Sequence, residues 1–392
     1  MKRSLWGLFV LLLMLYAAPA LSQEAKDITP SCALTPSVNR RHIRLMHDGK
    51  FTTSWGTAKT LEAELAIMLP EESGAYGIYI CWGNMPDAWT LEAEDGAWDK
   101  VHTDTREGFA HAYIPLNGQK QLRLIMENRE ERSISIHELY VFSNGEIPDW
   151  VQRWQPTVEK ADLMVLVAHP DDEHLYMGGT LPYYAGQLQK NVLVAYMTCA
   201  NVRRRSELLN GLWTVGLTHY PVIGNFPDRR HDSLEEMYAL WGREKTQRFV
   251  VDLYRKYQPQ VVVSHDIRGE YGHGAHRLCA AVSQFALEAS SDPAQYPESA
   301  TLYGVWDVPK LYLHLYRENS IKMDWRKPLS AFQGKTAFDM ASLGYAQHVT
   351  QQEYAFRVKD SGAYNCAKFG LVRSLVGPDE AGNDFFEHIS AK

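Results

Sequence analysis

Residues 168–173, Ala-His-Pro-Asp-Asp-Glu, place one histidine and three carboxylates directly after an apolar run at 163–167. The run is typical of a buried strand. Carboxylates seldom gather at the end of a core strand unless something positive lies among them. A divalent metal is the simplest such group, and it binds nitrogen and oxygen donors. The segment therefore predicts a metal-dependent enzyme with its site at the tip of a sheet.

A second apolar run at 261–264 precedes the stretch Gly-Glu-Tyr-Gly-His-Gly-Ala-His at 269–276. His273 and His276 stand at the start of a helix predicted over 277–288, and residues three apart share a helix face. In parallel α/β sheets, ligands bind at the carboxyl ends of the strands. We therefore expect the two histidines to supply the nitrogen donors that the first loop lacks.

A purely structural interpretation of both loops is the alternative. Asp171 or Asp172 would then cap the following helix by accepting backbone N–H bonds, and the histidines would be ordinary helix-start residues. We favour the metal site because the two loops together supply both ligands and proton-transfer groups.

The second half of the chain, 159–392, alternates strand-like and helix-like stretches. This alternation predicts an α/β domain with a mostly parallel sheet and helices on both faces. The expected strands are 163–167, 191–197, 222–223 and 261–264, and the expected helices are 179–189, 204–215, 243–257 and 277–288.

The preceding part, 30–145, has a different texture. Short apolar or alternating runs recur there, separated by Gly, Pro, Asn and Asp, which predicts an all-β sandwich. The runs are 61–68, 76–82, 110–116, 121–126 and 133–142, and residues 146–158 are the expected linker. Trp82, Trp89 and Trp98 either stack on sugars or fill the sandwich core, and burial is the commoner role of large aromatic residues.

Composition narrows the class of protein. The 392 residues carry a formal net charge of −7 and no long basic run, so a nucleic-acid partner is not expected. The basic cluster at 203–205 is either a solvated helix turn or a substrate contact. Five scattered cysteines without a Cys-x-x-Cys pair exclude a thiolate zinc site. Their odd number leaves at least one thiol free or bridged to another molecule.

The first 22 residues predict the compartment. Lys2 and Arg3 precede an apolar run at 5–16 and small residues at 17–22, as in a secretory signal peptide. An uncleaved anchor is the alternative, but the run is shorter than the ~20 residues of a spanning helix. The mature protein is expected to be secreted or periplasmic, with no transmembrane segment.

The two loops together resemble the PIG-L/LmbE-like family of zinc-dependent de-N-acetylases. Further matches are Arg204-x-x-Glu207-Leu208, Trp306-x-x-Pro309-Lys310 and Tyr345-x-x-His348. The resemblance runs from about residue 160 onward. It implies a Rossmann-like domain that removes acetyl groups from N-acetylglucosamine-type sugars. Residues 48–55 and 136–142 resemble the discoidin family of galactose-binding-like jelly rolls, which implies a carbohydrate-binding module.

Roles carried over from the family fall on five residues. His169, Asp172 and His276 match the zinc ligands, although another divalent metal also suits this donor set. Asp171 matches the general base that takes a proton from water. The leaving amine would take a proton from Asp171 or from His273, and Asp171 is favoured. His273 matches a second catalytic histidine, which donates to the oxyanion if it is protonated.

The chain departs from the family between the two histidines. Many members have Pro-Asp there, whereas this chain has Gly274 and Ala275. The carboxylate that would orient a histidine is absent, and Asp266 or Glu270 is expected to replace it. Glu173 is expected to support the ligands without binding the metal.

Substrate contacts are expected from loops at the same sheet edge. Arg204 or Arg205 would reach sugar hydroxyls, and Asp228 lies in a neighbouring loop. Tyr271 and Trp306 would stack on a sugar face. A surface or core role is at least as common for each of them.

The predicted function is that of a secreted, metal-dependent hydrolase. It would remove the N-acetyl group from N-acetylglucosamine-type sugars in a glycan or oligosaccharide, with the β-sandwich as a possible carbohydrate anchor. Alternatives are a hydrolase of another amide or acyl group on a glycan, and a non-catalytic carbohydrate-binding surface protein.

Overall fold

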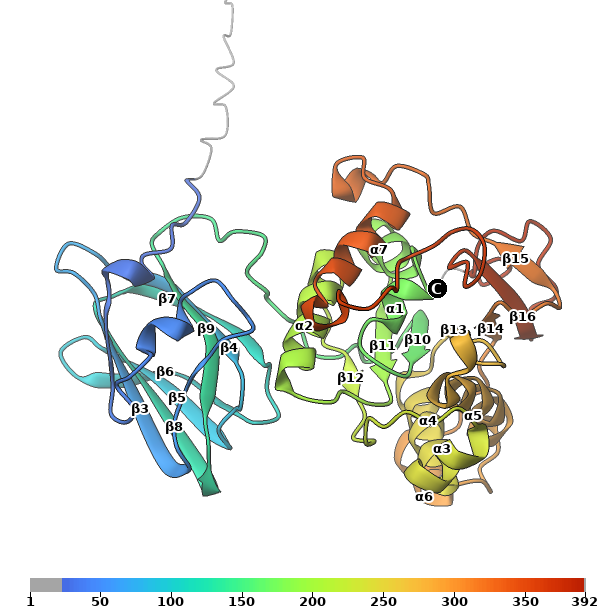
Figure 1. The fold of residues 1–392 in the computed structure, drawn as a ribbon, viewed down its shortest axis with the longest axis horizontal. Coiled ribbons are helices and arrows are strands. Elements are labelled where there is room, and N and C mark those ends of the chain that lie inside the picture. The colour runs from blue at the N-terminus through green and yellow to red at the C-terminus, as the bar shows by residue number, and fades with distance from the viewer. Residues whose placement is uncertain (1–22, 391–392) are drawn as a thin grey trace, which may run out of the picture.

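Two antiparallel sheets pack face to face in the N-terminal part of the chain (Figure 1). The computed structural model describes residues 23–390, so the predicted signal peptide at 1–22 lies outside the described residues. One sheet has the order β1 (Ala33–Pro36), β3 (Thr60–Met68), β8 (Gln121–Arg132), β5 (Ala88–Glu94) and β6 (Trp98–Thr105). The other has the order β2 (Trp55–Gly56), β9 (Ser135–Phe142), β4 (Ala75–Trp82) and β7 (His111–Gln119).

Alternating apolar residues build the core of this sandwich. Ala63, Leu65 and Ile67 of β3 pack in one buried cluster with Ile78 and Ile80 of β4, as the period-2 pattern of a half-buried strand requires. The sequence pattern missed β5 and β6. Strand β6 could not be found in this way because most of its side chains are exposed.

The sandwich tryptophans divide between the two expected roles. Trp82 and Trp89 are fully buried in the core, so the sugar-stacking interpretation is wrong for these two. Trp98 keeps 37% of its surface exposed, and the Arg123 guanidinium lies over its ring, 4.4 Å from the centroid.

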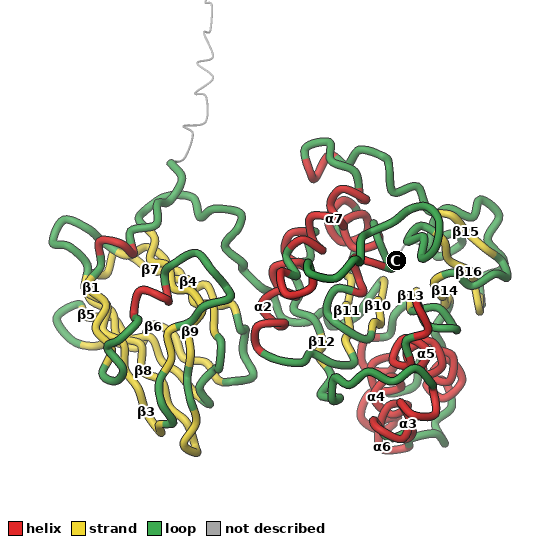
Figure 2. Tube along the Cα trace, in the orientation of Figure 1, coloured by secondary structure: helices red, strands yellow, loops and turns green. Residues whose placement is uncertain are grey.

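A mixed sheet with helices on both faces forms the second part of the chain (Figure 2). The sheet order is β12 (Val222–Ile223), β11 (Val192–Tyr196), β10 (Leu163–Val167), β13 (Val261–Ser264), β14 (Lys310–His314), β16 (Lys368–Ser374) and β15 (Ser320–Lys322). The first five strands are parallel, as expected. Strand β16 pairs antiparallel with β14 and β15, an edge that the sequence pattern did not predict.

Strand β10 shows how both faces of the sheet are covered. Leu163 and Val165 pack in the same cluster as apolar residues of the helix α2 (Val202–Thr214), whereas Met164 and Leu166 pack with those of α4 (Arg243–Tyr257) and α5 (Gly274–Ser291). The remaining α-helices are α1 (Asp172–Leu175), α3 (Leu234–Trp241), α6 (Pro297–Tyr303) and α7 (Ala337–Ala346). Short 3-10 turns occupy Thr29–Ser31, Ile43–Met46, Glu270–Gly272, Ser330–Phe332 and Val349–Gln351.

The helix expected over 179–189 is wrong in its extent. A single turn, α1, comes first, and Gly178 then adopts a positive φ of 53°. Pro182, which has no backbone N–H to donate, begins a π-helical turn at Pro182–Gln187.

The two parts of the chain contact each other directly, with α2 between the sandwich and the parallel sheet (Figure 1). Arg205 donates to the carbonyl of Gly83 at 2.8 Å, and the Ala110 backbone N–H donates to the Tyr220 hydroxyl at 3.1 Å. The expected linker is ordered, because Val151 is fully buried and Gln152 donates to Asn210 at 2.6 Å.

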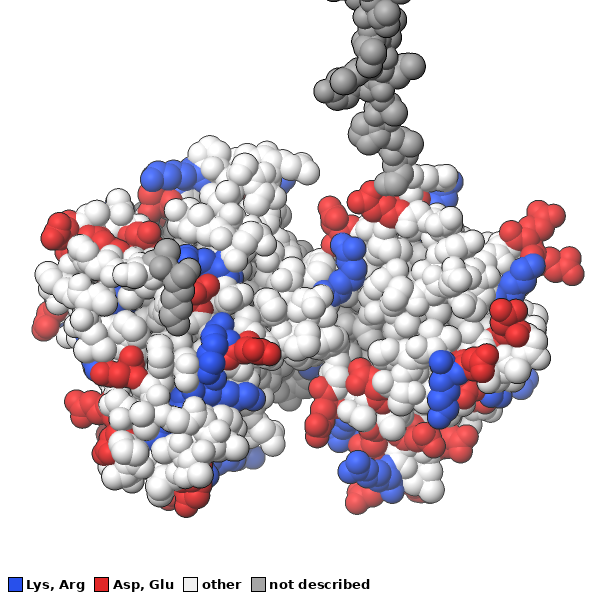
Figure 3. Space-filling model, turned by 180° about the vertical axis from the view of Figure 1, so that it is seen from behind, with Lys and Arg blue, Asp and Glu red and all other residues white. Residues whose placement is uncertain are grey.

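Charged residues of both signs intermingle over the face shown in Figure 3. Within residues 23–390, every helix is too short or too polar to cross a bilayer. All five cysteines are free thiols.

A buried ion pair ties the C-terminal segment to the parallel sheet. Lys310 is fully buried at the start of β14, and its Nζ lies 2.5 Å from Asp379 Oδ1.

We expect Asp379→Asn to lower the free energy of unfolding by about 3–5 kcal/mol, because it leaves the Lys310 charge buried and unpaired. Urea unfolding followed by circular dichroism measures this, with the exposed neighbour Glu380→Gln as control. If the urea concentrations at the midpoint of unfolding were equal for the two variants, the expected loss of stability would be wrong.

Candidate metal centre and active site

Two loops leave the same edge of the parallel sheet and meet there. Strand β10 ends at Val167 and leads through the Ala-His-Pro-Asp loop into α1, while β13 ends at Ser264 and leads to the start of α5. The two strands are neighbours in parallel register, so their carboxyl ends lie side by side. Residues about 100 positions apart in sequence therefore share one site.

The structure brings His169, Asp172 and His276 together. One donor atom of each lies within 4.8 Å of the others. Asp172 Oδ1 is 3.3 Å from His276 Nε2, and Asp172 Oδ2 is 3.2 Å from His169 Nδ1. Asp172 and His276 are buried, and two nitrogens with one carboxylate oxygen are a donor set that zinc accepts.

Glu270 orients His276 for this role. Its Oε2 accepts a hydrogen bond from His276 Nδ1 at 2.8 Å, which leaves the lone pair of the ring on Nε2. That Nε2 is buried and has no hydrogen-bond partner, although it lies beside Asp172. A histidine that donates its other nitrogen to a carboxylate is the usual support of a metal-binding histidine, so the arrangement fits a metal ion.

The same carboxylate accepts from two further histidines that sequence reasoning did not single out. Glu270 lies 2.8 Å from His265 Nδ1 and 2.6 Å from His314 Nδ1. His265 Nε2 lies 3.1 Å from the Ala168 backbone nitrogen. Burial lowers the pKa of His265, but the charges of Glu270 and Asp172 outweigh this effect and raise the pKa to about 10. His314 Nε2 lies 3.1 Å from the Asn365 carbonyl oxygen.

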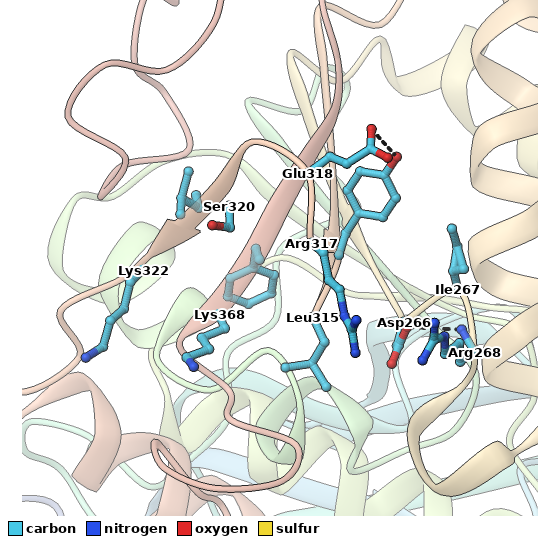
Figure 4. Close-up of a pocket in the computed structure, with 12 residues that line it drawn as sticks. Asp266, Ile267, Arg268, Leu315, Arg317, Glu318, Ser320, Lys322 and Lys368 are labelled. Atoms are coloured by element: carbon cyan, nitrogen blue, oxygen red, sulfur yellow. Dashed lines mark hydrogen bonds between the residues drawn. The ribbon is translucent and has the colours of Figure 1, made fainter.

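Asp266, the other residue expected to replace the missing carboxylate, lies elsewhere. It accepts the Arg268 backbone N–H at 3.0 Å and lines a cavity of about 630 Å³ between the loop after β13 and strands β14 to β16. Figure 4 shows Asp266 in that cavity beside Arg268 and Arg317. The structure therefore places Glu270, and not Asp266, in contact with His276.

Asp171 holds a backbone conformation that costs energy. Its φ of 110° and ψ of −26° lie where residues with a side chain are rarely found. Its N–H donates to Glu173 Oε2 at 2.9 Å, which helps to hold the turn. Burial, together with the charge of Asp172, raises the pKa of Asp171 well above its usual range, and Arg204 opposes this rise. A carboxyl of this kind is suited to taking and returning a proton near neutral pH.

Arg204 contacts this loop and not open solvent. Its Nη2 lies 3.6 Å from Asp171 Oδ2 and donates to the Pro170 carbonyl, while its Nη1 lies 3.6 Å from Glu207. The side chain is only 10% exposed. Arg205, the alternative substrate residue, binds the sandwich domain instead.

A cavity of about 450 Å³ opens above Asp171 and Asp172. Asp228 and Tyr271 line it, as expected from their loops. Asp228 Oδ1 is 3.8 Å from His169 Nε2. The far wall was not expected from the sequence, because it comes from the segment after α7. Its lining residues are Thr350, Gln351, Glu353, Tyr354 and Phe356.

His273 also lines this cavity, and its hydrogen bonding fixes its tautomer. Nδ1 accepts the Ala275 backbone N–H at 3.2 Å, which caps α5, so the proton of a neutral ring sits on Nε2. Burial, with the neighbouring His276, lowers the pKa of His273 to about 2. The ring is therefore a neutral donor, and the expectation that it acts as a protonated imidazolium is not needed.

Comparison with known proteins finds similarity over the part of the chain that holds both loops. Residues 164–287 match the PIG-L family model, described as GlcNAc-PI de-N-acetylase. The 1D-myo-inositol 2-acetamido-2-deoxy-alpha-D-glucopyranoside deacetylase 2 of Saccharopolyspora erythraea is 31% identical over 180 residues, which are 38% of this chain and 63% of that protein. A deacetylase of the same description from Nocardioides sp. is 25% identical over 261 residues, 57% of this chain and 85% of that protein.

The matches with curated relatives are partial in length. The chain spans 63%, 60% and 54% of the first three relatives that it matches. Among solved structures, the N,N'-diacetylchitobiose deacetylase from Pyrococcus horikoshii is similar with 18% identity and a TM-score of 0.38, over 49% of this chain and 71% of that one.

Glu270 and Asp266 are the two carboxylates that were expected to orient a histidine ligand, and the structure predicts opposite effects of changing them. We expect Glu270→Gln to weaken binding of Zn²⁺ by about 10–100-fold, because a neutral amide no longer holds His276 in the tautomer that leaves Nε2 free. Calorimetric titration of chelator-treated protein measures this affinity. Asp266→Asn is the matched control and should bind as the unchanged protein does. Equal affinities for the two variants would show that Glu270 does not orient a ligand.

Proposed function

We propose that this chain is a metal-dependent hydrolase that removes the N-acetyl group from N-acetylglucosamine-type sugars of a glycan or oligosaccharide. One observation carries the proposal: a His-Asp-His cluster, with Asp172 and His276 buried, stands beside a strained carboxylic acid, Asp171, at the floor of an open cavity. The match of residues 164–287 to de-N-acetylases supports the reaction. Relatives named as deacetylases of a 2-acetamido-2-deoxy-glucopyranoside support the sugar class.

His169, Asp172 and His276 are the proposed ligands of the metal. Zn²⁺ fits two nitrogens and one oxygen, and other divalent metals accept the same donors. When bound, such an ion lowers the pKa of a water molecule and stabilises negative charge on a carbonyl oxygen.

Asp171 is the proposed proton-transfer group. Its carboxyl takes a proton from the attacking water and gives one to the nitrogen of the departing amino sugar. The strained turn aims this side chain into the cavity, and Arg204 limits its movement through contacts with Pro170 and Asp171. We therefore propose that Arg204 acts as a positioning residue for Asp171, and not as the sugar ligand expected from sequence.

His273 is proposed to bind the acetyl oxygen. Its Nε2–H is free to donate because Nδ1 is engaged by the helix cap. The carbonyl oxygen gains negative charge as water attacks, so the bond strengthens towards the transition state. Tyr271 and Asp228, on the cavity wall, are the proposed contacts with the sugar ring and its hydroxyls.

Export and glycan anchoring are further parts of the proposal. The pattern of residues 1–22 supports a secreted or periplasmic location. A sandwich packed directly against the domain that carries the cavity supports a role in holding the enzyme on carbohydrate. The exposed Trp98 is the proposed stacking residue.

Acetate release from N-acetylglucosamine oligomers tests the reaction. We expect Asp171→Asn to lower kcat by about 10²–10⁴-fold, because the amide neither accepts nor returns the proton. The exposed sandwich residue Asp99 offers a matched control, and Asp99→Asn should keep full activity.

Chelation gives an independent arm of the same test. Activity should be lost in chelator and return on addition of Zn²⁺. Release of acetate that is equally fast in chelator, or in the Asp171 variant, would rule out the proposed mechanism. Tight glycan binding without acetate release under any condition would favour a binding protein.

A further inference from the structure

A second cluster of metal-ligating side chains lies behind the first. Glu173, His174 and His348 are each 0% exposed, and one donor atom of each lies within 4.8 Å of the others. Glu173 and His174 follow Asp172 in α1, whereas His348 comes from the turn after α7. None of the three lines the open cavity above Asp171.

The distances in this cluster are those of a coordination site. Glu173 Oε1 lies 3.2 Å from His174 Nε2 and 3.4 Å from His348 Nε2. Neighbouring ligands of a tetrahedral ion with bonds of about 2.0–2.1 Å are about 3.3 Å apart. The pair Asp172 and His276, in the proposed catalytic centre, has the same spacing of 3.3 Å.

The donor atoms of the cluster lack other partners. Glu173 Oε1 and both ring nitrogens of His174 and His348 are buried without a hydrogen bond. Leaving a buried polar group unpaired is unfavourable, and here five such atoms are gathered in one place. His276 Nε2 in the first centre shows the same signature. A purely hydrogen-bonded network would instead pair these atoms with one another.

We propose that Glu173, His174 and His348 bind a second divalent metal ion with a structural role. The Tyr196 hydroxyl is also buried without a hydrogen-bond partner, and it is the proposed ligand for the fourth position. The N/O donor set takes Zn²⁺ most readily among the common structural ions.

The second ion would support the catalytic turn from behind. Glu173 binds with Oε1, and its Oε2 accepts the Asp171 backbone N–H at 2.9 Å. Fixing Glu173 therefore fixes the strained residue that is proposed to move protons. This is the kind of surrounding constraint that a rare backbone conformation requires.

Two glycines let the neighbouring helices close over the cluster. A Cβ at Gly211 of α2 would lie 2.7 Å from His174 Nε2 and 3.0 Å from His348 Nε2. A Cβ at Gly344 of α7 would lie 2.5 Å from His174 Cε1. With both helices packed against the rings, an ion there has no open path to solvent. It should exchange far more slowly than one in the open cavity.

Metal counting on the full chain tests the proposal. Protein purified without chelator should contain two equivalents of divalent metal by inductively coupled plasma mass spectrometry. His169→Ala removes a ligand of the first centre and should retain one equivalent. His348→Gln keeps a hydrogen-bond donor beside Glu173 and should also retain one, in the first centre.

Chelator kinetics distinguish the two ions. In the unchanged protein, a chelator should remove one equivalent quickly and the second only after denaturant opens the fold. In His169→Ala, the remaining equivalent should be the slow one. The count does not depend on acetate release, so it stands apart from the proposed hydrolysis.

Some outcomes would overturn the second site. One equivalent in the unchanged protein and none in His169→Ala would do so, as would rapid removal of both equivalents. If His348→Gln does not fold, the counts for the unchanged protein and His169→Ala still decide, because neither alters the second cluster.

Discussion

The buried carboxylate of Glu270 is the interaction on which the candidate active site depends. It accepts hydrogen bonds from three histidines, on the loop after β13, at the end of β14 and in α5. A lone buried carboxylate would be strongly unfavourable, and a fully satisfied one becomes a rigid hub. His265 anchors the hub to the loop after β10, His314 ties it to the end of β14, and His276 is left with its Nε2 lone pair facing Asp172. The fold itself thus sets the geometry of the candidate ligands.

The strained backbone conformation of Asp171 is the second constraint. Three features of the fold stabilise it. The Glu173 carboxylate accepts a hydrogen bond from the Asp171 N–H, and Arg204 donates one to the Pro170 carbonyl. Parallel pairing of β10 with β11 and β13 fixes where the loop begins. A residue with φ of 110° survives only where its surroundings determine it this fully. The same turn separates two adjacent carboxyls into different environments, and that separation drives their pKa values apart.

Sequence reasoning reached the site residues that follow recognisable strands. The valine-rich runs at 163–167 and 261–264 are buried on both faces of the sheet, and this gives them a continuous apolar pattern. His314 was out of reach because β14 begins with Lys310, whose charge is buried only through a partner at Asp379. The sequence also did not predict the residues that form the far wall of the cavity. Its residues follow α7 in irregular backbone, and Glu207 of α2 holds them there through Thr350. Tertiary contacts of this kind leave no period in the sequence.

Four consecutive residues at the start of α1 serve different sides of the fold, and this follows from backbone geometry. Asp171 has left-handed torsions, which turn its side chain into the open cavity, while Asp172 begins the helix and faces His169 and His276. Helical rotation of about 100° per residue then carries Glu173 and His174 to the interior, towards His348. One loop therefore touches two donor clusters at once. Glu173 bridges them, through one oxygen to the Asp171 backbone and through the other to the inner histidines, so a change in the inner cluster would act on the Asp171 turn directly.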